Sequence, residues 1–119
     1  MKRIYICFPE GNYKALTLSY DDGKITDRRL IDILNQKWNQ GNFHLNSEYL
    51  GQTEGHSLPY ITKEDAGKLY CGHEIASHTS THPTMTRMPA EENVREVLSD
   101  RRAWKKSADI RSGDFPIRT

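Results

Sequence analysis

The sequence predicts a parallel α/β fold, and three features of it support this prediction. Runs of apolar and β-favouring residues alternate with segments whose apolar residues recur at helical spacing. This strand–helix order occurs three times and is followed by the start of a fourth unit. Such alternation is typical of parallel sheets with right-handed crossovers. The length of 119 residues indicates one domain and excludes a complete (β/α)8 barrel, which needs roughly 250 residues.

The predicted strands are short runs of apolar and β-favouring residues bounded by Gly, Pro, Asn or Asp. The second of them ends directly at Asp21-Asp22-Gly23, and the third follows Gly41. In chain order, the predicted strands cover residues 4–8 (an edge strand), 15–20, 42–46 and 73–77, and a further strand begins within 115–118.

Capping residues mark where the predicted helices begin. Thr26 or Asp27 can cap the first helix. Thr62, with Asp65 three residues later, resembles a capping box with a shorter acid and starts a second, short helix. Pro89 suits the first turn of a third helix. The predicted helices cover residues 26–37, 62–69 and 89–106, and a long loop covers 47–61.

The core of this fold is expected to be thin. Leu, Ile, Val and Phe account for 23 of the 119 residues, and chains this lean and charged are often disordered. However, the net charge is only +1, and six Tyr and two Trp favour a folded chain. In the third predicted helix, Val94, Val97, Leu98 and Trp104 form one apolar stripe.

Several classes of protein are disfavoured by composition. No apolar run approaches the roughly 18 residues of a membrane span, and no membrane partner is expected. The N-terminus lacks the long apolar region of a secretory signal, so a cytoplasmic or unknown location is expected. Cys7 and Cys71 are far apart, which favours two reduced thiols over a disulfide. Residues 87–119 carry eight basic and six acidic side chains, a mixed surface that argues against a nucleic-acid partner.

Two polar clusters follow predicted strands, at the ends where parallel α/β folds place their chemistry. Asp21 and Asp22 follow one strand, and the segment from His78 to His82 follows another. Two His four residues apart can face one way on a helical turn. With one carboxylate they make a three-ligand set that suits a catalytic zinc or similar divalent ion. The second Asp can then act as a base beside the ion.

For each cluster taken alone, an interpretation without any chemical function stays open. Asp-Asp-Gly is a common turn sequence, and a His pair at this spacing also occurs without a metal. The remaining histidines, His44, His56 and His73, form no metal-binding pattern. His44 is expected to be structural or solvated because it lies within a strand. His73 is expected at the start of a strand, the wrong end for chemistry.

The two clusters also resemble the motifs of a known family. Residues 15–23, Ala-Leu-Thr-Leu-Ser-Tyr-Asp-Asp-Gly, resemble the first motif of the polysaccharide deacetylases, which are also called NodB homology domains or carbohydrate esterase family 4. Residues 72–82, Gly-His-Glu-Ile-Ala-Ser-His-Thr-Ser-Thr-His, resemble the second motif of that family. Residues 43–47 resemble its second strand. Three blocks in the right order make the resemblance specific.

The resemblance implies a fold, an activity and a set of site residues. The fold is a distorted seven-stranded (β/α) barrel. The activity is removal of acetyl groups from N-acetylated or O-acetylated carbohydrate polymers, with Asp21 as the catalytic base. Asp22, His78 and His82 match the ligands of a divalent metal, Zn²⁺ first and Co²⁺ as an alternative. Thr79 matches a residue that supports the loop of the second motif.

The later motifs of the family find no match in this sequence. The third carries an Arg that orients the base beside a Pro-aromatic-Gly turn, and the fifth supplies a His that protonates the leaving group. Arg118 lies near the expected start of the third motif, but no such turn follows it. The sequence is therefore interpreted as the N-terminal part of the family domain over 1–119, a partial, truncated barrel. Its alternative is an inactive fragment that keeps a metal site, and open sheet edges are expected to favour self-association.

Overall fold

A three-stranded parallel sheet forms the centre of the molecule, as the alternating pattern predicts. The computed structural model describes residues 5–55 and 57–109. The strands are β1 (Ser19–Asp21), β2 (Asn42–Leu45) and β3 (Glu74–Ser77), and they pair in the order β1-β2-β3. Both pairings are parallel, so the carboxyl ends of all three strands lie at the same end of the sheet.

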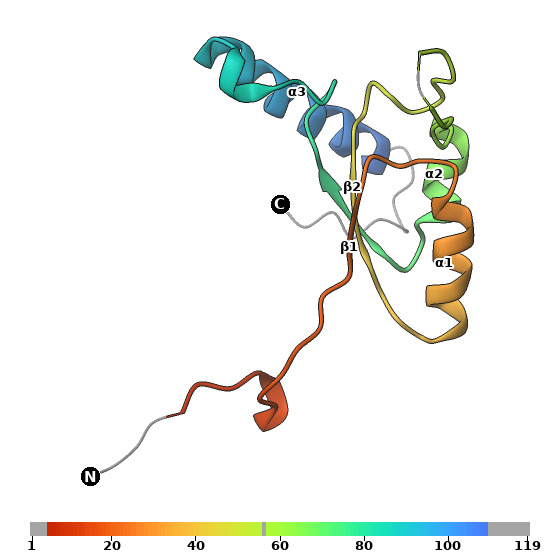
Figure 1. The fold of residues 1–119 in the computed structure, drawn as a ribbon, viewed down its shortest axis with the longest axis vertical. Helices are drawn as coiled ribbons and strands as arrows, with labels where there is room; N and C mark the ends of the chain where they lie inside the picture. The colour runs from red at the N-terminus through yellow and green to blue at the C-terminus, as the bar shows by residue number, and fades with distance from the viewer. Residues whose placement is uncertain (1–4, 56, 110–119) are drawn as a thin grey trace.

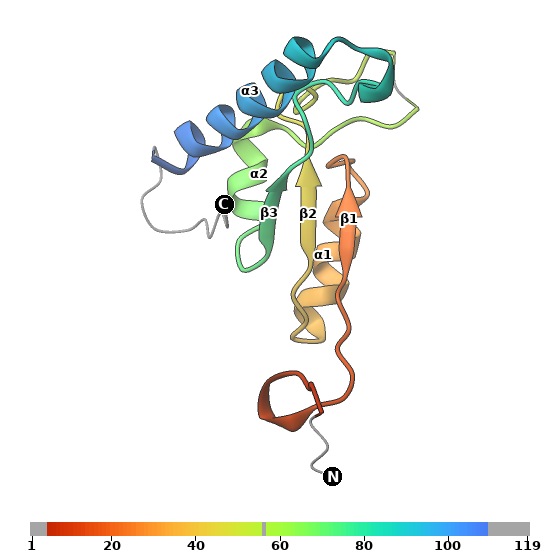
Figure 2. The ribbon, with the colours of Figure 1, turned by 90° about the vertical axis from the view of Figure 1, so that its left-hand side faces the viewer.

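Three α-helices surround the sheet: α1 (Asp27–Gln36), α2 (Lys63–Leu69) and α3 (Ala90–Asp109). Short 3-10 turns also form at Pro9–Gly11 and Met85–Arg87. α1 and α2 lie together on one side of the sheet, as Figure 1 shows. α3 lies beside β3 (Figure 2). Among the described residues, no helix combines the length and apolar character needed to cross a membrane.

The core forms where one row of strand residues meets the helices. Tyr20, Phe43 and Ile75 are paired across the three strands, and the Tyr20 and Phe43 rings stack at 5.5 Å. Phe43 and Ile75 are buried together with Ile31 of α1 and Ala66 of α2. The next row, one residue further along each strand, faces the other way and consists of Asp21, His44 and the small Ala76. Side-chain alternation along a strand thus separates an apolar face from a polar one.

Two buried polar residues of this core, Asp27 and Tyr70, are hydrogen-bonded to each other. The Tyr70 hydroxyl donates to Asp27 Oδ2 at 2.7 Å and so holds the first residue of α1. Burial raises the pKa of Asp27, the Tyr70 hydrogen bond lowers it, and the nearby Asp22 charge adds to the rise. Burial also raises the pKa of Tyr70. Both pKa shifts are in the direction that favours the protonated form of the group.

His73 is a structural residue at the start of β3. Its ring is buried, Nδ1 accepts from the Gly41 N–H at 3.1 Å, and Nε2 lies 3.1 Å from Asn35 Oδ1. A proton on Nε2 satisfies both contacts, because the amide oxygen can only accept. Burial lowers the pKa of His73, which keeps this neutral form. His73 thus joins α1 to the end of the sheet opposite the polar clusters.

The helix starts agree with the capping pattern to within one residue. Thr62 caps α2, since its side chain accepts from the Asp65 N–H at 3.2 Å. Thr26 precedes α1 but makes no capping hydrogen bond with its side chain. Pro89 lies just before α3 rather than in its first turn, and its carbonyl accepts from the N–H groups of Glu92 and Asn93.

Four expectations about strands and packing need correction or lie outside the described chain. Residues 5–8 are not a strand: they are irregular and exposed, because no neighbouring strand pairs with them. The strand expected over 15–20 is confined to β1, where β2 is available for pairing. The apolar stripe of α3 is buried only at Trp104, while Val94, Val97 and Leu98 are 40–56% exposed. The strand expected within 115–118 lies outside the described residues.

Candidate functional site

The two polar clusters meet at the carboxyl end of the sheet. Asp21 is the last residue of β1, and His78 directly follows β3. Backbone hydrogen bonds tie both segments to the central strand: the Asp22 N–H donates to the His44 carbonyl at 2.8 Å, and the His78 N–H reaches the Leu45 carbonyl at 3.2 Å. The clusters are 56 residues apart in sequence (78 − 22), and parallel pairing with β2 brings them together.

Asp22, His78 and His82 form a compact group, as the sequence predicts. One ligand atom from each lies within 4.8 Å of the other two, and Asp22 Oδ1 is 3.8 Å from His82 Nε2. The expected helical turn is wrong, however. Residues 78–82 form an irregular loop, and His82 turns back toward His78 through a left-handed backbone conformation (φ 48°).

The donor set and its spacing fit a divalent ion. Two ligands of one tetrahedral zinc lie roughly 3.4 Å apart, because each is about 2.0–2.1 Å from the ion. The Asp22–His82 separation of 3.8 Å therefore needs to close by only a few tenths of an ångström. Two imidazoles and one carboxylate are ligands that zinc and similar ions accept, and three protein ligands leave one position open. The side chains of Asp22 and His82 are 36% and 53% exposed, so the group is open to solvent.

Backbone strain is concentrated in this group. Asp22, Thr79 and His82 adopt φ values of 79°, 68° and 48°, and they are three of the five non-glycine residues with positive φ in the described chain. Thr79 is the least expected of them, because a β-branched residue rarely adopts this conformation. Such residues cost on the order of 1–3 kcal/mol each and persist where the surrounding structure holds them, often at functional sites.

Asn46 and Tyr49, which follow β2, hold the strained loop from one side. Asn46 is fully buried, and its Nδ2 donates to the carbonyls of His78 at 2.5 Å and Thr79 at 3.0 Å. The Tyr49 hydroxyl donates to the Thr81 carbonyl at 2.6 Å. Thr79, predicted to support this loop, contributes a carbonyl to the contact with Asn46. These bonds fix the direction of the backbone between the two histidines.

Carboxylates of α3 hold the same loop from the other side. Asp100 is fully buried and accepts from the N–H groups of Ser47 at 2.8 Å and His78 at 3.1 Å, and from the Ser77 hydroxyl at 2.5 Å. Glu96 accepts from the backbone N–H and the hydroxyl of Thr81, both at 2.9 Å. α3 therefore holds the ends of β2 and β3 through a buried charge-assisted network.

Sequence patterns did not reveal the residues that hold this loop (Asn46, Glu96 and Asp100), although one of them interrupts a recognisable pattern. Asp100 lies three residues after Val97 and four before Trp104, so a carboxylate interrupts the apolar stripe of α3. A polar residue in that position indicates a buried hydrogen-bonded group. Asn46 and Glu96 have no comparable signal.

Gly23 completes the turn after β1. Its φ is +73°, and a Cβ there would lie 2.9 Å from Leu45 Cδ2, closer than carbon atoms in van der Waals contact. The Asp-Asp-Gly turn therefore requires glycine at its third position, because the φ is positive and because there is no room for a Cβ. Gly23 thus packs against the core at the carboxyl end of β1, so the sequence is more than an ordinary surface turn.

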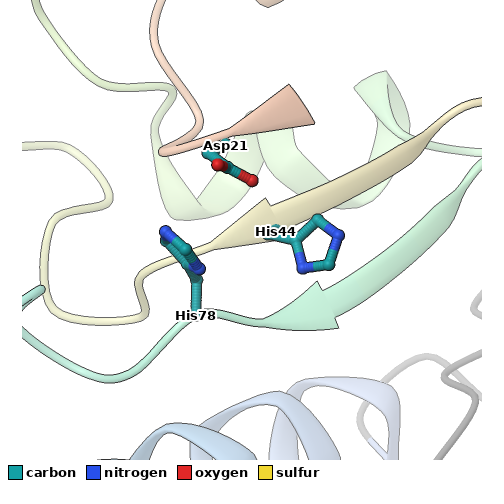
Figure 3. Close-up of side chains that lie close together, drawn as sticks. All are labelled: Asp21, His44 and His78. Carbon is teal, nitrogen blue, oxygen red and sulfur yellow. The ribbon is translucent and has the colours of Figure 1, made fainter. Parts of the chain in front are cut away.

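Asp21, the predicted base, is exposed and lies on the polar face of the sheet. It pairs directly with His44 across β1 and β2, and Figure 3 shows both side chains together with His78. His44 was expected to be structural or solvated. It is half-buried, and its Nε2 lies 2.9 Å from the Ser19 hydroxyl oxygen.

Comparison with known proteins agrees with the geometry. The family model described as polysaccharide deacetylase matches residues 8–112 of the 119-residue chain. No curated protein and no solved structure gave a significant match. The matched range includes the three strands, the Asp-Asp-Gly turn and the loop that carries both histidines. The chain belongs to the polysaccharide deacetylase family.

Proposed function

We propose that the chain is a metal-dependent hydrolase that removes acetyl groups from N-acetylated or O-acetylated carbohydrate polymers. Family membership supports the deacetylase class. The observation that carries the proposal is the group of Asp22, His78 and His82 next to a further carboxylate, Asp21, at the carboxyl end of a parallel sheet. We further propose that the sheet is part of a barrel of the family type.

In this proposal, Asp22, His78 and His82 hold the ion, Zn²⁺ first and Co²⁺ as an alternative. The ion supplies Lewis-acid chemistry, which polarises a carbonyl oxygen and lowers the pKa of water. The role of the holding residues is positional: Asn46, Asp100 and Glu96 keep the loop of the two histidines fixed before any ion arrives. Such preorganisation avoids a rearrangement cost during reaction.

Asp21 acts as the general base. Its carboxylate removes a proton from the water molecule that attacks the acetyl carbonyl carbon. As the bond from that carbon to the sugar nitrogen or oxygen breaks, this proton passes to the departing nitrogen or oxygen, which gives acetate and a free amine or hydroxyl. General-base catalysis by a positioned side chain is worth about 10²–10⁴-fold in rate. Asp21 is suited to this role because it neighbours the ligand Asp22 in sequence and lies on the open, polar face of the sheet.

Metal binding without turnover is the second candidate function. It is favoured by the exposure of Asp21 and of half of the His82 side chain, since an active site normally excludes water to strengthen its electrostatic interactions. Within the described residues, no ion pair with Arg or Lys orients Asp21.

Acetate release distinguishes the two candidates. The purified chain, loaded with Zn²⁺ or Co²⁺, is incubated with an N-acetylglucosamine oligosaccharide or a peptidoglycan fragment, and acetate is measured enzymatically. We expect Asp21→Asn to lower the rate by about 10²–10⁴-fold. Asp32→Asn, which changes an exposed carboxylate on α1 in the same way, should leave the rate unchanged. Bound metal with no acetate release above the Asp21→Asn background would support the second candidate instead.

A further inference from the structure

A second group of three possible ligands lies beside the first. Asp21, His44 and His78 each offer one ligand atom, and these atoms lie within 4.8 Å of one another. Asp21 and His44 are direct partners across β1 and β2, so their side chains project from the same face of the sheet. His78 reaches them from the end of β3, as Figure 3 shows. The group combines two imidazoles and one carboxylate, the same donor set as the first.

A separate contact prepares His44 for binding. Its Nε2 lies 2.9 Å from Ser19 Oγ, two residues before Asp21 on β1. The tautomer that donates this hydrogen bond from Nε2 leaves the lone pair on Nδ1. Histidines that bind metals almost always have their other ring nitrogen held in this way, which fixes both the tautomer and the ring orientation. The Ser19 contact is thus independent of the distances within the group and indicates the same role.

His78 belongs to both groups. Its ring centroid lies 5.9 Å from that of His44 and 4.9 Å from that of His82. A neutral imidazole has one ring nitrogen whose lone pair is available to a metal, so His78 can bind one ion at a time. The two groups therefore compete for His78, and an ion in one of them excludes an ion of the same kind from the other.

We propose that Asp21, His44 and His78 form an alternative position for a divalent cation, which takes the same class of ion as the group of Asp22, His78 and His82. An ion in the alternative position engages the carboxylate of Asp21, which can then no longer accept a proton from water. Ion binding at this alternative position does not depend on the proposed function. The loss of Asp21 as general base rests on the proposed function. The chain would hold one ion at a time. That ion would occupy either the position that leaves Asp21 free or the position in which Asp21 is a ligand.

Metal titration of single and double variants tests the binding position. Zn²⁺ is titrated against a chromophoric chelator, and Co²⁺ is followed by its visible absorption. Loss of a partner that only orients a ligand already costs about 10–100-fold in affinity. We therefore expect His82→Ala to retain one equivalent of ion with affinity reduced at least about tenfold, because the ion is then held by Asp21, His44 and His78 instead. His44→Ala combined with His82→Ala should weaken binding at least about tenfold further.

Controls separate this proposal from loss of folding and from failure of the proposed function. His44→Asn keeps a polar side chain on β2 and should reproduce the effect of His44→Ala in the His82→Ala background, with an unchanged far-ultraviolet circular dichroism spectrum. Ser19→Ala in that background should weaken binding by about tenfold. Equal affinities for His82→Ala and the double variant would overturn the alternative position. That result would leave acetate release by the unsubstituted chain, and hence the proposed function, untouched.

Discussion

At the scale of single residues, the candidate site and the buried His73 lie at opposite ends of the sheet. Asp21, Asp22, His78 and His82 lie at the carboxyl end, where they are open to solvent. His73 lies at the opposite end, buried and with both ring nitrogens engaged. The same residue type therefore has an exposed role at one end and a structural role at the other, and burial decides which.

Stability should fall as the pH is lowered below about 6.5 because of His73. Burial lowers the pKa of His73 in the folded state, so between the folded and unfolded pKa values the unfolded chain binds a proton that the folded chain does not. The free energy of unfolding then decreases with falling pH, by at most about 1.4 kcal/mol per pH unit for one proton. Chemical unfolding at several pH values between 5 and 8 measures this slope, within roughly the range where His titrates.

His73→Gln provides the control for that prediction. Glutamine can accept from Gly41 and donate to Asn35 but does not titrate, so its unfolding free energy should depend less on pH. Every other side chain is the same in the two proteins, so the difference between the two curves belongs to residue 73. Identical slopes for the two proteins would show that His73 contributes nothing to the pH dependence.

The sequence predicted the candidate ligands but not what holds them. Asp22, His78 and His82 stand in short local motifs at strand ends, so periodicity and spacing reveal them. Asn46 and Asp100 act through contacts 22–53 residues away along the chain, which no local pattern encodes. The helical turn predicted for residues 78–82 failed for the same reason, because contacts from β2 and α3 override local preference.

At the scale of elements, α3 is the least conventional part of the fold. It contacts β3, but most of its apolar stripe is exposed, and Trp104 is its buried apolar anchor. A second link to the sheet is polar: Asp100 accepts three hydrogen bonds at the ends of β2 and β3. The helix is therefore held by a buried carboxylate as well as by apolar contact.

Asp100→Asn should weaken both the fold and metal binding. The amide would present an NH₂ group to donors at Ser77 or His78, and leaving a buried donor unsatisfied costs about 1–3 kcal/mol. We expect a lower free energy of unfolding in urea and, at a pH where the variant is folded, weaker Zn²⁺ binding. Glu91→Gln, an exposed change in the same helix, should alter stability by less than about 0.5 kcal/mol. Lower stability with unchanged zinc affinity would show that Asp100 does not position His78.

Prediction of the elements succeeded where a local signal exists. The capping pattern at Thr62 correctly placed α2, and the strands at 42–46 and 73–77 appear as β2 and β3 within one residue at each end. Of the strand predicted over 4–8, the described residues 5–8 are irregular, because β propensity does not supply a partner and no described strand pairs with them. Pairing is a property of the assembled sheet.

At the scale of the whole molecule, one end of the chain carries much exposed apolar surface. The segment before β1 extends away from the sheet, as Figures 1 and 2 show. In it, Tyr5, Ile6, Tyr13 and Leu16 are 70–97% exposed. β1, the strand that this segment enters, lies at the edge of the sheet. Exposed apolar surface next to an open edge favours association.

We therefore propose that the chain self-associates as its concentration rises. Light scattering after size-exclusion chromatography should show a mass that increases with loading. Ile6→Lys combined with Leu16→Lys should shift the distribution toward monomer, because charges on an edge segment oppose pairing. A double substitution to Lys at Arg28 and Arg29, which conserves charge on α1, is the control. An unchanged mass distribution in the Ile6, Leu16 variant would contradict association through this segment.

The contacts of α3 also set an order of events during synthesis. Both histidines of the loop leave the ribosome before Glu96 and Asp100, which hold the loop in its strained conformation. Until α3 docks, residues 78–82 are held only from the side of β2, by Asn46 and Tyr49. The loop that carries both histidines thus gains its full set of contacts with the last described helix, after the sheet has been made.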